Sequence, residues 1–158
     1  MRVVVFSDTH GNYPLAIRAL EKIGVFAQIV HLGDEIEDAR IIEELTGQPL
    51  LKVPGNCDMG CKDPSELLME IAGRKIFMTH GDGYQVKSGL STLWKKAAIE
   101  GAEVALYGHT HVAAVTMIEG ILFINPGTLS TRSVGASCAL LIFSPTEITA
   151  EIVPINSW

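Results

Sequence analysis

The sequence has few cysteines, and their number does not fit a disulfide framework. Cys57, Cys61 and Cys138 are the only three among 158 residues, so at least one has no partner within the chain. An odd count without paired C-x-x-C units argues against a disulfide-stapled secreted scaffold and favours a reducing, intracellular setting. We therefore expect a cytoplasmic protein that is stabilised by its hydrophobic core.

Long apolar runs and an excess of basic residues are also lacking. Only four apolar residues separate Arg2 from Ser7, which is too short for a signal peptide, and no run approaches the ~18 residues that cross a bilayer. The net charge of −6 argues against nucleic acid as a partner. An acidic protein can still bind a phosphate compound if metal ions supply positive charge locally.

What the sequence does contain is enough apolar material for a real core. Hydrophobic residues make up 47% of the 158 positions, and charged residues make up 19%. This length and composition predict one globular domain over residues 1–158. The oligomeric state is left open, and a homo-oligomer is among the alternatives.

The first third of the chain alternates buried strands with amphipathic helices. Short β-branched runs without polar alternation are typical of strands that are covered on both faces. Pro14 opens the first helix, and Asp38 is expected to cap the second. The β-α-β-α-β order predicts parallel strands with right-handed crossovers. The expected elements are strand 3–6, helix 14–23, strand 27–30, a helix that Gly47 closes, and strand 50–53.

The rest of the chain favours hairpins, with one further helix. Glu119-Gly120 is a two-residue turn between two apolar runs, and similar turns fall near residues 73–74 and 145–146. A helix begins at Ser88 or Ser91 and ends at Gly101. The expected strands are 66–72, 75–78, 104–106, 112–118, 121–124, 139–143 and 148–153. Pairing in this part is expected to be largely antiparallel.

Five separate strands end in residues that can bind a metal ion. In open α/β sheets, ligands bind outside the carboxyl ends of the strands, so these side chains are expected to gather. Any one match is weak, because a turn Asp or Asn or a hydrogen-bonded core His is the ordinary alternative. Five matches in register are hard to assign to chance. The residues are Asp8 with His10, Asp34, Asn56, His80, and His109 with His111.

His109 and His111 place two candidate ligands only two residues apart. In extended backbone, residues two apart point to the same side, with Cα atoms roughly 6.5 Å apart. Two imidazoles placed in this way could share one metal ion or face two neighbouring ions, and the simple alternative is a pair of surface histidines on a loop. The spacing alone does not decide between these possibilities.

Taken together, these motifs resemble the calcineurin-like metallophosphoesterase superfamily, and in particular its small bacterial and archaeal phosphodiesterase branch. The resemblance covers nearly the whole chain. It implies an α/β fold, a four-layer α/β/β/α sandwich of two mixed β-sheets, with a dinuclear metal site at one edge. The motifs are Asp8-Thr9-His10, Gly33-Asp34, Gly55-Asn56-Cys57-Asp58, Thr79-His80-Gly81, Gly108-His109-Thr110-His111 and Asn125-Pro126-Gly127-Thr128.

The resemblance also implies how the ligands divide between two divalent metal ions. Seven nitrogen and oxygen ligands are too many for one tetrahedral zinc ion, and they suit two ions of higher coordination number. Mn²⁺ is the first expectation, and Fe, Co, Ni or Zn fit the same donors. Asp34 would bridge the two ions. Asp8, His10 and His111 would hold one ion, and Asn56, His80 and His109 the other.

The implied activity is hydrolysis of a small phosphoester, with a diester favoured over a monoester. In the family mechanism, a hydroxide that bridges the two metal ions attacks phosphorus in line, and the metals offset the developing charge. The residues that the resemblance places in catalysis are Asp34, Asn56, Cys57 and Asp58. Asn56 and Cys57 are also expected to contact the substrate, and so are Asp82 and Arg132, which are particular to this sequence.

Three departures from the family pattern qualify this expectation. Cys57 stands where many relatives carry the histidine that protonates the leaving group, and a thiol is a weak hydrogen-bond donor. Asp82 stands where a second histidine is common, and its charge would repel a phosphate dianion. Pro54 replaces a frequent arginine, and Arg132 can supply part of that charge, with a structural salt bridge as the alternative. These changes favour diesters.

Two other functions compete with the enzymatic one. The first is a protein-binding scaffold on the same fold, similar to the retromer subunit that resembles this branch, and the second is a nuclease. The complete ligand set disfavours the scaffold, and the acidic charge disfavours the nuclease. His31 is expected to be a core residue near the site. Cys61, Cys138, Trp94 and Trp158 are expected to be packing or surface residues.

Overall fold

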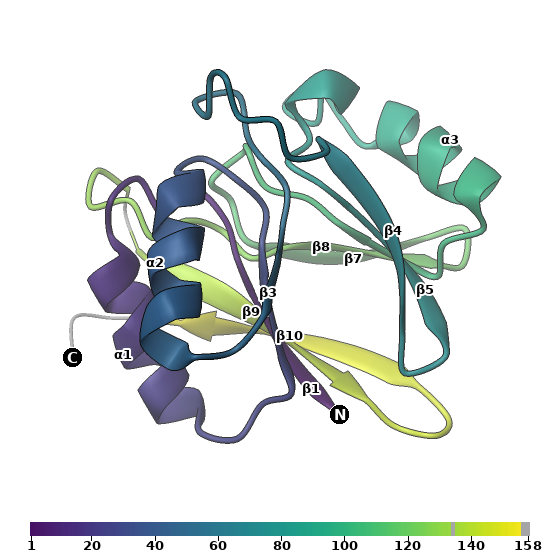
Figure 1. Cartoon of the computed structure of the whole chain (residues 1–158). Helices are drawn as coiled ribbons and strands as arrows, with labels where there is room; N and C mark the ends of the chain where they lie inside the picture. The colour runs from purple at the N-terminus through teal and green to yellow at the C-terminus, as the bar shows by residue number, and fades with distance from the viewer. Residues whose placement is uncertain (134, 156–158) are drawn as a thin grey trace.

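The computed structural model describes residues 1–133 and 135–155, which form two five-stranded sheets with helices outside them (Figure 1). The first sheet contains β1 (Arg2–Phe6), β2 (Gln28–His31), β3 (Leu50–Lys52), β9 (Ser137–Phe143) and β10 (Ile148–Pro154). The second contains β4 (Glu66–Ile71), β5 (Arg74–Thr79), β6 (Val104–Leu106), β7 (Ala114–Ile118) and β8 (Ile121–Asn125). The helices are α1 (Tyr13–Ile23), α2 (Ile36–Thr46), α3 (Ser91–Glu100) and the short 3-10 helix η1 (Asp82–Tyr84).

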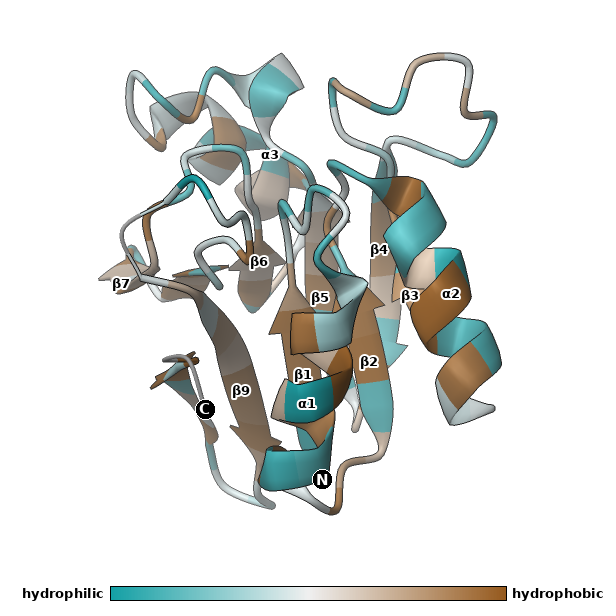
Figure 2. Cartoon of the chain, turned by 90° about the vertical axis from the view of Figure 1, so that its left-hand side faces the viewer, coloured by the Kyte–Doolittle hydropathy of each residue, from teal (hydrophilic) through white to brown (hydrophobic). Residues whose placement is uncertain are grey.

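The side chains of β1 point alternately into two apolar clusters, one on each face of the first sheet. Val3 and Val5 pack between the two sheets, whereas Val4 and Phe6 pack against α1 and α2. Successive side chains of a strand point to opposite faces, so a strand covered on both faces is apolar throughout. Most of β1 and β9 is accordingly brown in Figure 2, whereas α1 and α2 alternate between brown and teal.

A third apolar cluster covers the other face of the second sheet. Phe77, Ala105 and Phe123 from its central strands pack against Leu93 and Ala97 of α3. The layers therefore run α1 and α2, first sheet, second sheet, α3. This confirms the four-layer α/β/β/α sandwich of two mixed sheets.

Strand pairing directs several carboxyl ends to one place. The order of the first sheet is β10-β9-β1-β2-β3, in which β1, β2 and β3 are parallel, as the sequence predicts. The order of the second is β4-β5-β6-β8-β7. Its outer pairs are antiparallel, but β6 is parallel to both β5 and β8, so its centre departs from the expected antiparallel pairing.

Some boundaries differ from the sequence expectation. Helix α2 begins at Ile36, and Asp38 is not its cap, because Asp38 lies in the first turn and accepts a hydrogen bond from the Gly11 N–H at 2.8 Å. Helix α3 begins at Ser91. Asp38 was expected at a cap because acidic residues are frequent there, but its carboxylate instead ties α2 to the loop that follows β1.

The cysteine and tryptophan residues that the sequence assigns to packing or to the surface can now be placed. Cys138 is buried in the core, Cys61 is partly buried against it, and Trp94 packs with the α3 cluster. Trp158 lies outside the described residues. No helix in the described part of the chain is long and apolar enough to cross a membrane.

Candidate metal centre

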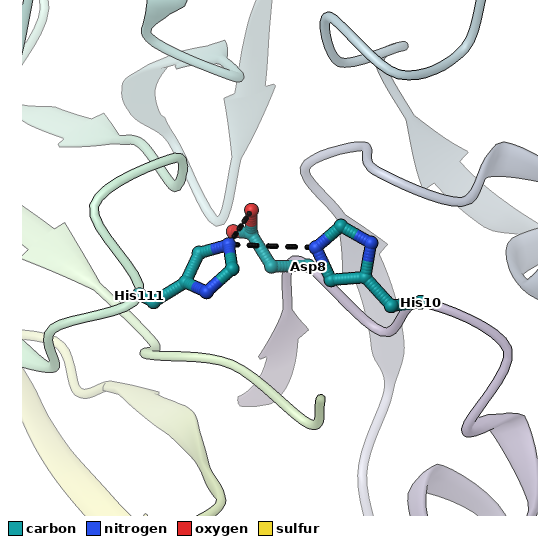
Figure 3. A group of neighbouring side chains, drawn as sticks. All are labelled: Asp8, His10 and His111. Carbon is teal, nitrogen blue, oxygen red and sulfur yellow. Dashed lines mark hydrogen bonds and ion pairs between the residues drawn. The ribbon is translucent and has the colours of Figure 1, made fainter. Parts of the chain in front are cut away.

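Two clusters of potential metal ligands meet at the carboxyl ends of strands from both sheets. Asp8, His10 and His111 form one cluster (Figure 3). Asp34, His80 and His109 form the other, and in each cluster the ligand atoms lie within 4.8 Å of one another. Six of the seven residues that the sequence suggests as ligands are thus brought together in two groups of three.

The first cluster is built around a fully buried carboxylate. Oδ2 of Asp8 accepts hydrogen bonds from the Ser7 hydroxyl at 2.5 Å and the His109 N–H at 3.0 Å. Oδ1 of Asp8 lies 3.0 Å from Nε2 of His111, which in turn lies 3.4 Å from Nε2 of His10. The two outer bonds fix the carboxylate so that Oδ1 faces the histidines (Figure 3).

The second cluster presents a histidine in a fixed tautomer. Nδ1 of His80 lies 2.7 Å from the Leu32 carbonyl oxygen, so this nitrogen carries the proton and donates it. In the neutral ring Nε2 is the unprotonated nitrogen, and it faces Asp34 Oδ2 at 3.5 Å and Asp8 Oδ1 at 4.0 Å. The His109 ring stands edge-on to the His80 ring, with centroids 5.1 Å apart.

Two buried atoms at the junction of the clusters have no hydrogen-bond partner in the described structure, namely Asp8 Oδ1 and His80 Nε2. A buried lone pair without a donor is costly, and such atoms in a native fold require an explanation. A carboxylate oxygen and an imidazole nitrogen are both ligands for divalent transition metals. The donor set and the two unpartnered atoms therefore fit metal ions.

The electrostatics of the junction favour positive charge. Burial opposes protonation of His80, but the Asp34 and Asp8 carboxylates outweigh burial and raise the pKa of His80. Burial raises the pKa of the Asp34 carboxyl, yet its interaction with His80 and the hydrogen bond from the Cys57 N–H at 2.8 Å together hold that pKa below its usual value. The pKa of His109 is lowered by burial, with Lys87 and His80 adding to the effect.

Several of the candidate ligands share an uncommon backbone conformation. Left-handed backbone is unfavourable for residues other than glycine, and it concentrates at functional sites. The sequence predicts extended chain for His109 and His111, and this prediction is wrong, because both residues lie on the loop between β6 and β7. Five of the candidate ligands have positive φ, namely Asp8, His10, Asp34, His109 and His111.

Asn125 holds the histidine loop in this conformation. Its side-chain amide donates to the Gly108 carbonyl at 2.9 Å and to the Thr110 hydroxyl at 3.0 Å. The turn is closed by a bond of 2.7 Å from the Thr110 N–H to the Gly108 carbonyl. Sequence reasoning marked Asn125 only as part of a loop motif, and its position at the end of β8, beside β6, is what gives it this role.

The loop after β3 contributes the remaining candidates. Cys57 Sγ forms a group with ligand atoms of His10 and Asp34, all within 4.8 Å. Partial burial and the nearby Asp34 carboxylate raise the pKa of the Cys57 thiol to about 11, so it keeps its proton at neutral pH. The exposed side chain of Asn56 points its amide to Cys57 Sγ at 3.5 Å.

Asp58, which the resemblance implies in catalysis, binds backbone groups of two loops. Its carboxylate accepts hydrogen bonds from the backbone N–H groups of Asp34 at 2.9 Å, Ile36 at 2.7 Å and Gly55 at 2.7 Å. Both oxygens are occupied by the two loops that carry Asp34 and Asn56. The Asp58 carboxylate therefore ties these two loops together.

The two candidate substrate contacts lie near different clusters. Arg132 lines a hollow of about 580 Å³ together with His10 and His111. Asp82 is exposed in η1, and its charge acts on His109. The structure thus places Arg132 beside the first cluster and Asp82 near the second.

His31 is buried beside the site, as the sequence suggests. Its Nδ1 accepts a hydrogen bond from the Gly33 N–H at 3.1 Å, so its Nε2 carries the proton and donates it to the Thr9 hydroxyl at 3.1 Å. Burial lowers the pKa of His31 to about 4. The neutral ring joins the loops after β1 and β2.

Comparison with known proteins decides the family. The profile of the calcineurin-like phosphoesterase superfamily domain matches residues 1–146. The chain belongs to this superfamily. This calcineurin-like phosphoesterase domain is 33% identical over 130 residues to the probable metallophosphoesterase YsnB of Bacillus subtilis, covering 82% of the chain and 75% of YsnB.

Two further comparisons agree with the assignment to the calcineurin-like phosphoesterases. The phosphodiesterase YfcE of Escherichia coli K12 is 27% identical over 160 residues, covering 82% of this chain and 80% of YfcE. A crystal structure from Streptococcus pneumoniae, described as a predicted phosphoesterase, superimposes with a TM-score of 0.79 at 25% identity, covering 98% of this chain and 89% of that one.

Glycine at position 108 is required by a close approach between the two sheets. A Cβ there would lie 1.9 Å from Ser7 Oγ and 2.8 Å from Asp8 Oδ2. We expect Gly108→Ala to cost about 1–3 kcal/mol of unfolding free energy, as overpacking does, and to weaken metal binding by displacing Asp8. Urea unfolding and calorimetric titration with Mn²⁺ measure the two effects.

Gly83→Ala is the matched control, because a Cβ at Gly83 meets nothing within 4 Å. Its free energy of unfolding should change by less than about 0.5 kcal/mol. Equal stability and equal Mn²⁺ affinity of the two variants would contradict the steric role of Gly108.

The lowered pKa of His31 predicts a specific loss of stability in acid. The unfolded state takes up the His31 proton near pH 6.5 and the folded state near 4, so stability is present above this window and falls as the pH drops through it. One proton contributes at most about 1.4 kcal/mol per pH unit. Urea unfolding of the metal-free protein from pH 7 to 4 measures the slope.

His31→Asn is the comparison variant, because its side-chain oxygen can replace Nδ1 as the acceptor for Gly33 but does not titrate. Its unfolding free energy should fall less steeply between pH 6.5 and 4. Identical slopes for the two proteins would rule out His31 as the group responsible.

Proposed function

We propose that this protein is a metal-dependent phosphoesterase that acts on a small phosphoester substrate, with diesters preferred. The observation that carries the proposal is the pair of buried, unpartnered atoms, Asp8 Oδ1 and His80 Nε2, 4.0 Å apart between two histidine-containing clusters. The family membership and the name of the relative YfcE, a phosphodiesterase, support it. Three unpaired cysteines agree with a reducing, cytoplasmic setting.

Two divalent ions fit the donors better than one. We assign Asp8, His10 and His111 to the first ion, Asn56, His80 and His109 to the second, and Asp34 to both. When bound, such ions lower the pKa of a water molecule and offset the negative charge of a phosphoryl group. The nitrogen and oxygen donors suit Mn²⁺ first, and they also suit Fe, Co, Ni or Zn.

The protein groups around the ions have distinct tasks in this proposal. Asp34 remains ionised, because its pKa is lowered. Cys57 keeps its proton and is our candidate to donate one to the leaving group. Arg132 binds a phosphate oxygen, and the Asp82 charge disfavours a dianionic monoester more than a monoanionic diester. Asn56 orients the substrate, and Asp58 positions the loops.

Removal and return of metal tests the proposal directly. The chelated protein should be inactive, and Mn²⁺ should restore hydrolysis of bis(4-nitrophenyl) phosphate above that of 4-nitrophenyl phosphate. Asn56→Ala should lose roughly tenfold or more, since even indirect disturbance of a metal ligand costs that much. Release of 4-nitrophenol measures all of these rates.

Gln48→Ala, an amide substitution between α2 and β3, is the control and should keep full activity. If no metal restores any hydrolysis, the scaffold function replaces the enzymatic one. A protein that prefers the monoester would refute the diester preference alone.

Cys57 predicts a dependence on the leaving group. A thiol with a pKa of about 11 is a weak acid, so leaving groups that need a proton should depart slowly. Cys57→His should raise the rate for methyl 4-nitrophenyl phosphate only slightly. It should raise the rate for dimethyl phosphate about tenfold or more, within the range of general acid catalysis. An equal gain on both substrates, or no gain, would contradict the idea.

A further inference from the structure

Glu35 has the most unusual backbone in the neighbourhood of the site. Its φ of 148° and ψ of 92° lie outside the regions that residues with a Cβ ordinarily occupy. Backbone of this kind costs of the order of 1–3 kcal/mol and persists only where the surroundings impose it. An observed outlier of this kind is a reason to look for a function.

The cause of the strain is the Asp58 carboxylate. One of its oxygens accepts from the Asp34 N–H at 2.9 Å and the other from the Ile36 N–H at 2.7 Å, on either side of Glu35. The Glu35 carbonyl accepts from the Asp38 N–H at 3.1 Å, in the first turn of α2. Held at three points, the residue between Asp34 and Ile36 cannot relax.

This conformation places Glu35 between two hollows that both reach the metal centre. One, of about 580 Å³, is also lined by His10, His111 and Arg132. The other, of about 480 Å³, is also lined by Cys57. Glu35 is therefore the one residue among the described lining residues that borders the first metal cluster on one side and Cys57 on the other.

Two opposite charges face the larger hollow without being paired. In the described part of the chain, the Glu35 carboxylate and the Arg132 guanidinium make no hydrogen bond or ion pair with another side chain. The other lining residues are polar as well, namely Ser130, Thr131 and Ser133. None of the described residues that line the hollow has an aliphatic or large aromatic side chain on which a nucleobase or an acyl chain would pack.

We propose that Glu35 is a specificity-determining residue that selects phosphoesters of polyhydroxylated alcohols, such as polyol or sugar phosphodiesters. This inference rests on the proposed function of the site. A carboxylate accepts hydrogen bonds from two neighbouring hydroxyls at once, and a guanidinium binds a phosphate oxygen in a bidentate manner. In this hollow, Glu35 would accept the hydroxyl groups of the ligand and Arg132 would bind its phosphate. Ser130 and Thr131 add side-chain hydroxyls that can form further hydrogen bonds.

Binding to the Mn²⁺-loaded protein tests the proposal with two ligands that differ only in hydroxyl groups. Calorimetry should give diglyceryl phosphate an affinity about tenfold or more above that of dipropyl phosphate, since a hydrogen bond to a charged group contributes about 1.5–3 kcal/mol. Glu35→Gln should reduce this ratio to threefold or less. Glu44→Gln, which changes an exposed acid of the helix that Glu35 precedes, should leave the ratio unchanged.

Equal affinities for the two ligands in the parent protein would overturn the proposal, as would an unchanged ratio in Glu35→Gln. Hydrolysis of bis(4-nitrophenyl) phosphate by the same preparation is measured separately. Its absence would refute the proposed function, while the calorimetric ratio still decides the role of Glu35.

Thermal unfolding provides a second readout that does not depend on the ligand. Glu35→Gly removes the Cβ that this backbone crowds, so its midpoint should rise by about 2–4 °C, whereas Glu35→Gln should stay within about 1 °C of the parent. A gain in stability together with a lost ligand preference is the pattern expected of a residue kept under strain for function. A Glu35→Gly protein that is no more stable than the parent would contradict the strain.

Discussion

Two buried carboxylates, Asp8 and Asp34, impose the constraint on which this structure depends. Negative charge away from water is costly unless it is paired with cations or saturated with hydrogen bonds. Each carboxylate has one oxygen bound to backbone or hydroxyl groups and one oxygen turned toward histidines. The hydrogen bonds to one oxygen fix the orientation of the other oxygen of the same carboxylate. The oxygens that face the histidines make the junction of the two sheets suitable for binding cations.

The sandwich supplies the rigidity that such a junction needs. Asp8 and Asp34 follow strands of the first sheet, and His80, His109 and His111 follow strands of the second. A shared apolar core holds the two sheets in register, so loops from both can meet with little freedom. That core offsets the cost of five ligand residues in left-handed backbone, which local preferences alone would not allow.

Much of this arrangement could be predicted from the sequence, because the end of a buried strand is visible as an apolar run followed by polar residues. Apolar runs ending in Asp8, Asp34 or His80 identified both the elements and the candidate ligands, and the family motifs gave the layers. Backbone conformation could not be predicted in the same way. The His109–His111 segment reads as extended chain, but Asn125, distant in sequence, bends it. Asp38 was misjudged for a similar reason, since its hydrogen-bond partner, the Gly11 N–H, lies on another loop.

The separation of the ligands along the chain has a consequence for folding. His10 and His111 are 101 residues apart in sequence, yet their Nε2 atoms lie 3.4 Å from each other. An ion held by both would close a loop of that length, and closing a long loop removes conformational entropy from the unfolded chain. Since all three cysteines are free in the described structure, bound metal would then act as a reversible cross-link between the halves of the chain. Metal supply would govern the lifetime of the folded state as well as its chemistry.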